Sequence, residues 1–325
     1  MADKRGIAVA GTVIVDRINE ISAYPKSGEL TQILSIQKAI GGCVPNVALD
    51  LKKISPALPV RVIGRVGNDE DGAYVRQTLD DAGLDTDGLL TDETAPTSFT
   101  EVMSVTGGQR TFFTYSGASA AFGADDMDFG DTLPEILHLG YFLLLQKVDD
   151  GDGLKILKAA KEKGIRTSID LVSENSDRYS LVKPCLAYTD YLVINELEAG
   201  MLAGIEPKNG NLQKIAEALK SMGVREKVII HKPDCAVCLS DAGFMVLPSY
   251  ALPAGYIKGT TGAGDAFCAG ALYGIYEGWN DLQILEFASA SAVMALGAAD
   301  ATSGLVEEQA VKAFCSQFER QNVAL

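Results

Sequence analysis

Short apolar runs rich in β-branched residues alternate with helical patterns along most of this chain, and that alternation constrains the fold more than any other feature. Such a rhythm is typical of strand–helix–strand units, in which helices connect parallel strands. It predicts an α/β fold with a doubly wound, mostly parallel sheet that is flanked by helices on both faces. The expected strands span residues 7–15, 60–66, 136–139, 166–171, 191–194 and 227–231, and the expected helices lie near 47–54, 73–82, 153–162 and 212–222.

Two segments interrupt this rhythm, because they carry strand-like signals with no helix between them. They comprise residues from about 16 to 39 and from about 97 to 115. We expect them to pair as a small β-sheet outside the main sheet, within a single α/β domain that spans residues 1–325. The last third of the chain is expected to add a hairpin of residues 236–239 and 244–247 and helices near 264–277, 282–296 and 307–320.

Charge and cysteine content narrow the possible partners. The net charge of −15 repels nucleic acid and anionic lipid, so neither is an expected partner. The apolar start of the chain is expected to be a buried strand and not a signal peptide. Six scattered cysteines fit the reduced thiols of a cytoplasmic protein better than a disulfide framework. Cys235 and Cys238 have C-x-x-C spacing, but residues three apart on a strand face opposite sides, so they should not share a metal.

The string GTTGAGDAF at residues 259–267 leads directly into a helical pattern. A glycine-rich turn before a helix leaves backbone N–H groups unpaired, and together with the helix dipole they attract anions such as phosphate. Asp265 lies at the helix start, where a carboxylate tends to stay ionised and could accept a proton from an attacking hydroxyl. From these residues alone, a plain helix cap is an equally good interpretation.

Two further motifs carry polar groups that suit ligands. Residues 41–48 read GGCVPNVA, in which a Gly-Gly pair permits close approach of the backbone and Asn46 offers both a donor and an acceptor. Residues 195–198 read NELE directly after an expected strand, and oxygen ligands of this kind suit Mg²⁺ with retained water. Taken alone, the first motif is better explained as a plain loop that enters a helix, and a helix cap is a common explanation of the second.

Together the three motifs resemble the signatures of the ribokinase-like (PfkB) carbohydrate kinases, and the resemblance extends over nearly the whole chain. In that family the aspartate of the C-terminal signature is the catalytic base, and its Gly-Ala-Gly amides form an anion hole. The resemblance therefore implies that Asp265 is the base and that Gly262, Ala263 and Gly264 form the anion hole. It implies an ATP-dependent kinase that phosphorylates a hydroxyl of a sugar or sugar-like molecule.

The same resemblance gives roles to the other motifs. Asp16, Gly42 and Asn46 match positions that bind the substrate. The family's N-x-x-E motif holds the magnesium–phosphate assembly, often through water. Arg110 is a further candidate substrate contact from the small sheet, and a solvated position explains it equally well. The residues expected to bind ATP or Mg²⁺ are Asn195, Glu198, Thr260, Gly262 and Gly264.

The small sheet resembles the family's lid, which excludes water and often dimerises, so a homodimer through the lid is expected. A nucleoside is an alternative substrate, because aromatic side chains in residues 97–115 would suit a base. A catalytically silent sugar- or nucleotide-binding regulator is a second alternative, although the intact Asp265 argues against it.

Two departures from the family pattern leave cofactor contacts open. Residues 230–234 lack the glycine that is common there, so the contacts to adenine stay open. Gly259 replaces an aspartate found in several members, so a requirement for a monovalent cation stays open as well.

Overall fold

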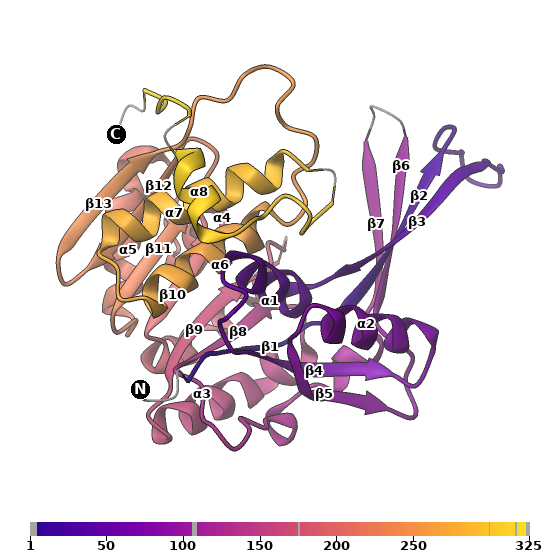
Figure 1. Ribbon diagram of the computed structural model, residues 1–325, viewed down its shortest axis with the longest axis horizontal. Coiled ribbons are helices and arrows are strands. Elements are labelled where there is room, and N and C mark those ends of the chain that lie inside the picture. The colour runs from indigo at the N-terminus through magenta and orange to yellow at the C-terminus, as the bar shows by residue number, and fades with distance from the viewer. Residues whose placement is uncertain (1–4, 106–108, 175, 299, 316, 323–325) are drawn as a thin grey trace.

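The main sheet forms the centre of the molecule (Figure 1). The computed structural model describes residues 5–105, 109–174, 176–298, 300–315 and 317–322. Within these residues the sheet has nine strands in the spatial order β13-β12-β11-β10-β9-β8-β1-β4-β5. They are β1 (Ile7–Ala10), β4 (Val60–Gly67), β5 (Asp85–Asp92), β8 (Ile136–Phe142), β9 (Arg166–Leu171), β10 (Tyr191–Asn195), β11 (Lys227–His231), β12 (Cys235–Ser240) and β13 (Gly243–Pro248).

The seven strands β5, β4, β1, β8, β9, β10 and β11, in this spatial order, pair in parallel. Strands β12 and β13 extend the sheet in antiparallel fashion. The chain winds outward from β1 in both directions, because β1 lies between β4 and β8. In doubly wound folds the carboxyl ends of the strands on either side of such a point form the ligand crevice. The topology therefore indicates the edge of the sheet where the predicted site residues should be sought.

Helices cover both faces of the sheet because both faces are apolar. Successive strand residues alternate between two buried clusters: Val9 belongs to the first and Ala8 to the second. This twofold alternation is expected for a sheet that is buried on both sides. The first cluster contains residues of α1 (Cys43–Ile54), α2 (Glu70–Asp81), α6 (Ala263–Tyr276), α7 (Asp281–Leu296) and α8 (Glu308–Cys315), and the second contains residues of α3 (Gly153–Glu162), α4 (Glu196–Ala203) and α5 (Leu212–Ser221).

A second sheet projects from one end of this body (Figure 1). Its strands are β3 (Ile33–Gly41), β2 (Ile14–Ile21), β6 (Phe99–Val105) and β7 (Arg110–Tyr115), in that spatial order. The β2–β6 pair is parallel and the outer pairs are antiparallel. The predicted fold class, a doubly wound sheet with helices on both faces plus a small separate sheet, is confirmed.

The expected single strand over residues 7–15 is wrong. Strand β1 ends at Ala10, and β2 begins at Ile14 in the other sheet. Gly11 takes a φ of 135°, and a Cβ there would lie 2.6 Å from the carbonyl oxygen of Gly140. The apolar run is continuous because both strands are buried at this junction, so hydrophobicity alone could not locate the break.

Strand β5 is not among the strands predicted from the sequence. Its sequence, DTDGLLTD, is mostly polar because it lies at the edge of the sheet and pairs only with β4. The expected hairpin is confirmed as β12 and β13. Cys235 and Cys238 belong to opposite buried clusters, as their spacing on a strand predicted. Among the described residues, no helix combines the length and the apolar character that crossing a bilayer requires.

Candidate active site

The glycine string forms the turn that begins α6. Gly262 precedes the helix with a φ of 80°, and a Cβ at this position would lie 2.3 Å from the carbonyl oxygen of Ala301. Only glycine fits this combination of conformation and space. The first N–H groups of a helix lack acceptors within it, so the amides near Ala263 and Gly264 are suited to bind an anion. Thr260 lies exposed in the same loop.

The carboxylate of Asp265 is held in the first turn of α6, where its side chain is 6% exposed. Asn46 Nδ2 donates to Asp265 Oδ2 at 2.8 Å, and the Tyr141 hydroxyl lies 3.1 and 3.0 Å from Oδ1 and Oδ2. Burial, and secondly the charge of Asp170, raise the pKa of Asp265 to about 7, although the bonds from Asn46 and Tyr141 oppose this shift. The expectation that the helix start keeps this carboxylate ionised needs correction, because desolvation outweighs the donors.

Tyr141 was not found by sequence reasoning. It lies near the end of β8 with a φ of 60°, which is uncommon for a residue other than glycine, and Leu143 has a φ of 77°. The register of β8 against β9 shifts here, and the backbone N–H of Tyr141 donates to Asp170 Oδ1 at 2.5 Å. Strained backbone of this kind is concentrated at functional sites. It directs the hydroxyl of Tyr141 to Asp265.

The start of α1 carries two predicted substrate residues, and one of them, Asn46, contacts Asp265. Gly42 precedes the helix with a φ of 90°, and a Cβ there would lie 2.6 Å from the carbonyl oxygen of Thr12. Asn46 is 3% exposed and makes the bond to Asp265 described above. Its Oδ1 is buried and has no hydrogen-bond partner among the described residues. A buried acceptor of this kind is costly unless a ligand satisfies it.

The small sheet carries the other two predicted substrate residues. Asp16 lies within β2, whereas the expected strand over residues 7–15 would have placed it just after a strand of the main sheet. A Cβ on Gly41 would lie 2.4 Å from Asp16 Oδ2. Burial raises the pKa of Asp16 to about 6. Arg110 begins β7, and its Nη1 lies 3.5 Å from Thr261 Oγ1 in the glycine loop. Its side chain therefore reaches from the small sheet to the loop before α6.

Asn195 and Glu198 form a capping box at the start of α4. The Asn195 side chain accepts from the Glu198 N–H at 2.9 Å, and the Asn195 N–H donates to Glu198 Oε2 at 3.1 Å. Asn195 Nδ2 and the Ser173 hydroxyl both donate to Glu198 Oε1, at 2.7 and 2.8 Å. Burial raises the pKa of Glu198 to about 7. The pair is thus a helix cap by geometry, whatever else it binds.

A cleft of about 370 Å³ lies where these elements meet. It is bounded by the ends of β8 to β11 and the start of α6, so Asn195 and Glu198 face the same space as Asp265. His231 also lines it, and burial lowers the pKa of that imidazole to about 4. The predicted residues that line the cleft are Asn195, Glu198, Gly262, Gly264 and Asp265.

The other predicted residues lie outside the lining of this cleft. Asn46 is joined to it by the bond to Asp265, and Arg110 by its approach to the glycine loop. A larger cavity of about 810 Å³ lies at the amino ends of β1, β4 and β5. None of the predicted site residues lines that cavity, and its position at the opposite ends of the strands argues against a catalytic role.

The comparison with protein families decides the family. The sequence profile of the pfkB family carbohydrate kinases matches residues 4–308. The chain belongs to the pfkB family. It is therefore a carbohydrate kinase, a phosphotransferase with an alcohol group as acceptor, and the predicted family and enzyme class are confirmed.

Relatives of this pfkB-family kinase act on several substrates. The ribokinase of Arabidopsis thaliana is 26% identical over 310 residues, which cover 94% of this chain and 79% of that protein. A 5-dehydro-2-deoxygluconokinase of Clostridium perfringens is 24% identical over 298 residues, covering 88% and 86% of the two chains.

The same fold occurs in solved structures. The Arabidopsis ribokinase complexed with ribose and ATP superimposes with a TM-score of 0.82 at 22% identity, covering 96% of this chain and 99% of that chain. A putative ribokinase II from E. coli in complex with ATP and Mg²⁺ gives 0.78 at 19% identity, covering 95% and 98%. Family homologues thus bind ATP and Mg²⁺ on this fold.

Proposed function

We propose that this pfkB-family kinase transfers the γ-phosphoryl group of ATP to a hydroxyl of a sugar, with Asp265 as the general base. The observation that carries the proposal is the position of the Asp265 carboxylate. It lies at a helix start whose amides can bind phosphate, and it faces the cleft. A proton acceptor beside a phosphate cradle is the arrangement that phosphoryl transfer to an alcohol requires.

In this proposal the neighbours of Asp265 have separate tasks. Asn46 and Tyr141 orient the carboxylate and stabilise its charged form through their donated hydrogen bonds. A pKa of about 7 suits a group that must take up a proton from the attacking hydroxyl near neutral pH. The amides of Gly262, Ala263 and Gly264 stabilise the charge that develops on the transferred phosphoryl oxygens.

The part of the cleft lined by Asn195 and Glu198 suits a magnesium–nucleotide complex. Glu198 and Asn195 present oxygen atoms, which Mg²⁺ prefers, at the end of a buried strand. Both side chains are already engaged in the capping box, which favours contact to the ion through retained water over direct coordination. Bound Mg²⁺ would neutralise phosphate charge. Thr260, Gly262 and Gly264 would contact the phosphates from the other side.

The sugar would lie between the first turn of α1 and the small sheet. Asp16 and the unpartnered Oδ1 of Asn46 are acceptors for sugar hydroxyls, and Gly42 lets the backbone approach the ring. The small sheet acts as a lid that excludes water, and Arg110 links it to the phosphate loop. The exposed apolar side chains of the lid support a homodimer through this sheet.

Consumption of ATP across a panel of sugars and nucleosides tests the proposal. We expect turnover with at least one sugar, in the presence of Mg²⁺, and its loss in Asp265→Asn. Turnover with nucleosides alone would replace the sugar by a nucleoside substrate. A folded protein that binds ATP but turns over neither class would overturn the proposal in favour of a silent regulator.

A further inference from the structure

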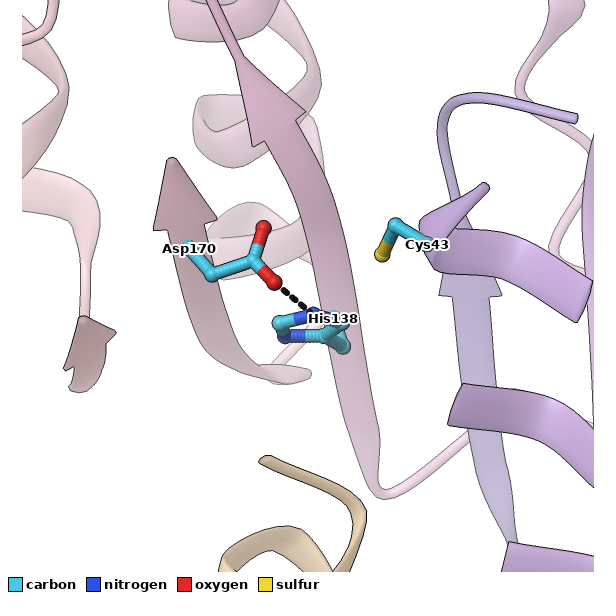
Figure 2. A group of neighbouring side chains, drawn as sticks. All are labelled: Cys43, His138 and Asp170. Atoms are coloured by element: carbon cyan, nitrogen blue, oxygen red, sulfur yellow. Dashed lines mark ion pairs between the residues drawn. The ribbon is translucent and has the colours of Figure 1, made fainter. Parts of the chain in front are cut away.

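Three potential metal ligands lie close together in the interior of the protein (Figure 2). Cys43 is the first residue of α1, His138 lies in the middle of β8, and Asp170 lies near the end of β9. One ligand atom of each lies within 4.8 Å of those of the other two, and all three side chains are buried. Neither Cys43 nor His138 has a role in the proposed phosphoryl transfer or in the proposed magnesium site.

The imidazole of His138 is oriented so that one nitrogen faces Ser168 and the other faces Asp170. Its Nδ1 lies 3.1 Å from the hydroxyl of Ser168, which fixes the ring. Its Nε2 lies 3.5 Å from Asp170 Oδ2 and 3.6 Å from the Sγ of Cys268. Histidine ligands of metals are commonly fixed in this way, with one nitrogen hydrogen-bonded and the other turned to the ion.

A glycine creates the space in which the thiol and the carboxylate meet. A Cβ at Gly140 would lie 1.8 Å from Cys43 Sγ and 3.1 Å from Asp170 Oδ1. Any other residue at this position would therefore expel the thiol of Cys43. The convergence depends on this local absence of a side chain, so it is built into the packing between α1 and β8.

We propose that Cys43, His138 and Asp170 form a binding site for a divalent cation of the zinc class, with a fourth position left open. Thiolate, imidazole and carboxylate together suit Zn²⁺ and its analogue Co²⁺, whereas Mg²⁺ prefers oxygen alone. Tetrahedral coordination at about 2.0–2.3 Å places neighbouring ligand atoms roughly 3.3–3.8 Å apart. The 3.5 Å between His138 Nε2 and Asp170 Oδ2 already falls in this range, and the ligand atom of Cys43 lies within 4.8 Å of those of the other two residues.

An ion can reach these groups from the cleft. Asp170 lines the cleft directly, while Cys43 and His138 are buried and do not line it. The site therefore opens toward the cleft of Asp265 but uses different ligands from the proposed magnesium site at Glu198. Binding here does not depend on the proposed kinase reaction, and it can be tested without ATP.

Cobalt provides a spectroscopic test on the full chain, after treatment with chelator and in the absence of ATP and Mg²⁺. We expect one equivalent of Co²⁺ to bind with a thiolate-to-cobalt charge-transfer band and the strong visible bands of tetrahedral cobalt. Cys43→Ser and His138→Asn should each weaken binding at least tenfold. The asparagine amide can retain the bond to Ser168, so His138→Asn removes chiefly the Nε2 ligand.

Two matched variants serve as controls. Cys185→Ser removes another buried thiol outside the cluster, and Glu198→Gln alters the proposed magnesium site. Both should bind Co²⁺ as the wild type does. Unchanged binding in Cys43→Ser and His138→Asn, or loss of the charge-transfer band in either control, would overturn the proposal.

A measurement on the wild-type protein keeps the test independent of whether the variants fold. X-ray absorption at the zinc edge should show sulfur at about 2.3 Å together with nitrogen or oxygen ligands. A shell of nitrogen and oxygen alone would contradict the assignment.

Discussion

At the scale of single residues, the charge state of Asp265 is set by a competition between burial and hydrogen bonding. Desolvation favours the neutral carboxyl, and the donors Asn46 and Tyr141 favour the carboxylate. Burial has the larger effect, with the charge of Asp170 acting in the same direction, so the pKa rises to about 7. A base with such a pKa is ionised in a substantial fraction of molecules at neutral pH and still accepts a proton readily.

Replacing Asp265 by asparagine should lower turnover by about 10²–10⁴-fold, because the amide cannot accept the proton. The fold should be retained. A raised pKa contributes stability only while the carboxyl is protonated, and this contribution is lost as the pH rises through about 7. The neutral amide avoids that loss, so the melting temperature of Asp265→Asn at pH 8 should not fall below that of the wild type.

Turnover at saturating substrates and thermal melting are the measurements. A variant that melts normally and keeps more than about a tenth of the wild-type rate would mean that Asp265 is not the base.

The pH dependence of turnover provides a second prediction. Because the base must be ionised, kcat should rise with pH and level off above about pH 7. Glu198 also has a pKa raised to about 7, so Glu198→Gln is the necessary control. If the rise belongs to Asp265, it persists in that variant; a flat profile in Glu198→Gln would assign it to Glu198 instead.

Glu198→Gln should also raise the Mg²⁺ concentration needed for half-maximal rate by more than it weakens sugar binding. Glutamine can replace glutamate in a capping box, so α4 should remain intact. Rates measured over a magnesium titration, with circular dichroism as the control of folding, test this assignment. An unchanged magnesium requirement would remove Glu198 from the metal site.

At the scale of elements, β2 and β7 carry the two predicted substrate residues of the small sheet, Asp16 and Arg110. Asp16 packs against Gly41, next to the turn that begins α1, and α1 carries Asn46 to Asp265. Arg110 of β7 reaches Thr261. Two strands of the small sheet are thus connected to the glycine loop or to Asp265 through short chains of contacts.

We expect Asp16→Ala to weaken sugar binding about tenfold or more while leaving ATP binding nearly unchanged. Hydrogen bonds to a charged group contribute roughly 1.5–3 kcal/mol each, and Asp16 lies on the sugar side of the proposed site. Calorimetry with each ligand separately measures both effects. Equal sugar affinity in the two proteins would exclude Asp16 from the substrate site.

At the scale of the whole molecule, the projecting sheet exposes an apolar surface. Its large exposed side chains include Ile36, which is 68% exposed, and Phe113, which is 59% exposed. Every residue of β7 is exposed. Exposed large apolar side chains gathered on one small sheet are typical of protein–protein contacts.

A charged residue on this surface should therefore dissociate the proposed homodimer. We expect sedimentation velocity to show a dimer for the wild type and a monomer for Ile36→Glu. Leu181→Glu is the matched control, since Leu181 is 43% exposed but lies outside the small sheet. A monomeric wild type, or dissociation by Leu181→Glu alone, would contradict dimerisation through the lid.

Much of the architecture followed from the sequence, because periodicity and turn chemistry are local properties. The alternation of strand and helix patterns determined the doubly wound sheet, and Gly262 determined the sharp start of α6. Strand β5 was not predicted, because an edge strand with polar residues lacks the apolar pattern of a buried strand. The break between β1 and β2 after Ala10 was not predicted either, because both strands are buried where they meet.

Only the tertiary structure decided which groups meet and in which state of charge. Asn46 and Asp265 are 219 positions apart, and Tyr141 reaches Asp265 only because its backbone adopts a positive φ. The approach of Cys43 to the strand that carries His138 likewise requires the glycine at position 140 of that strand. Contacts between distant residues, and the burial that shifts a pKa, arise from packing in three dimensions, which no local pattern of residues encodes.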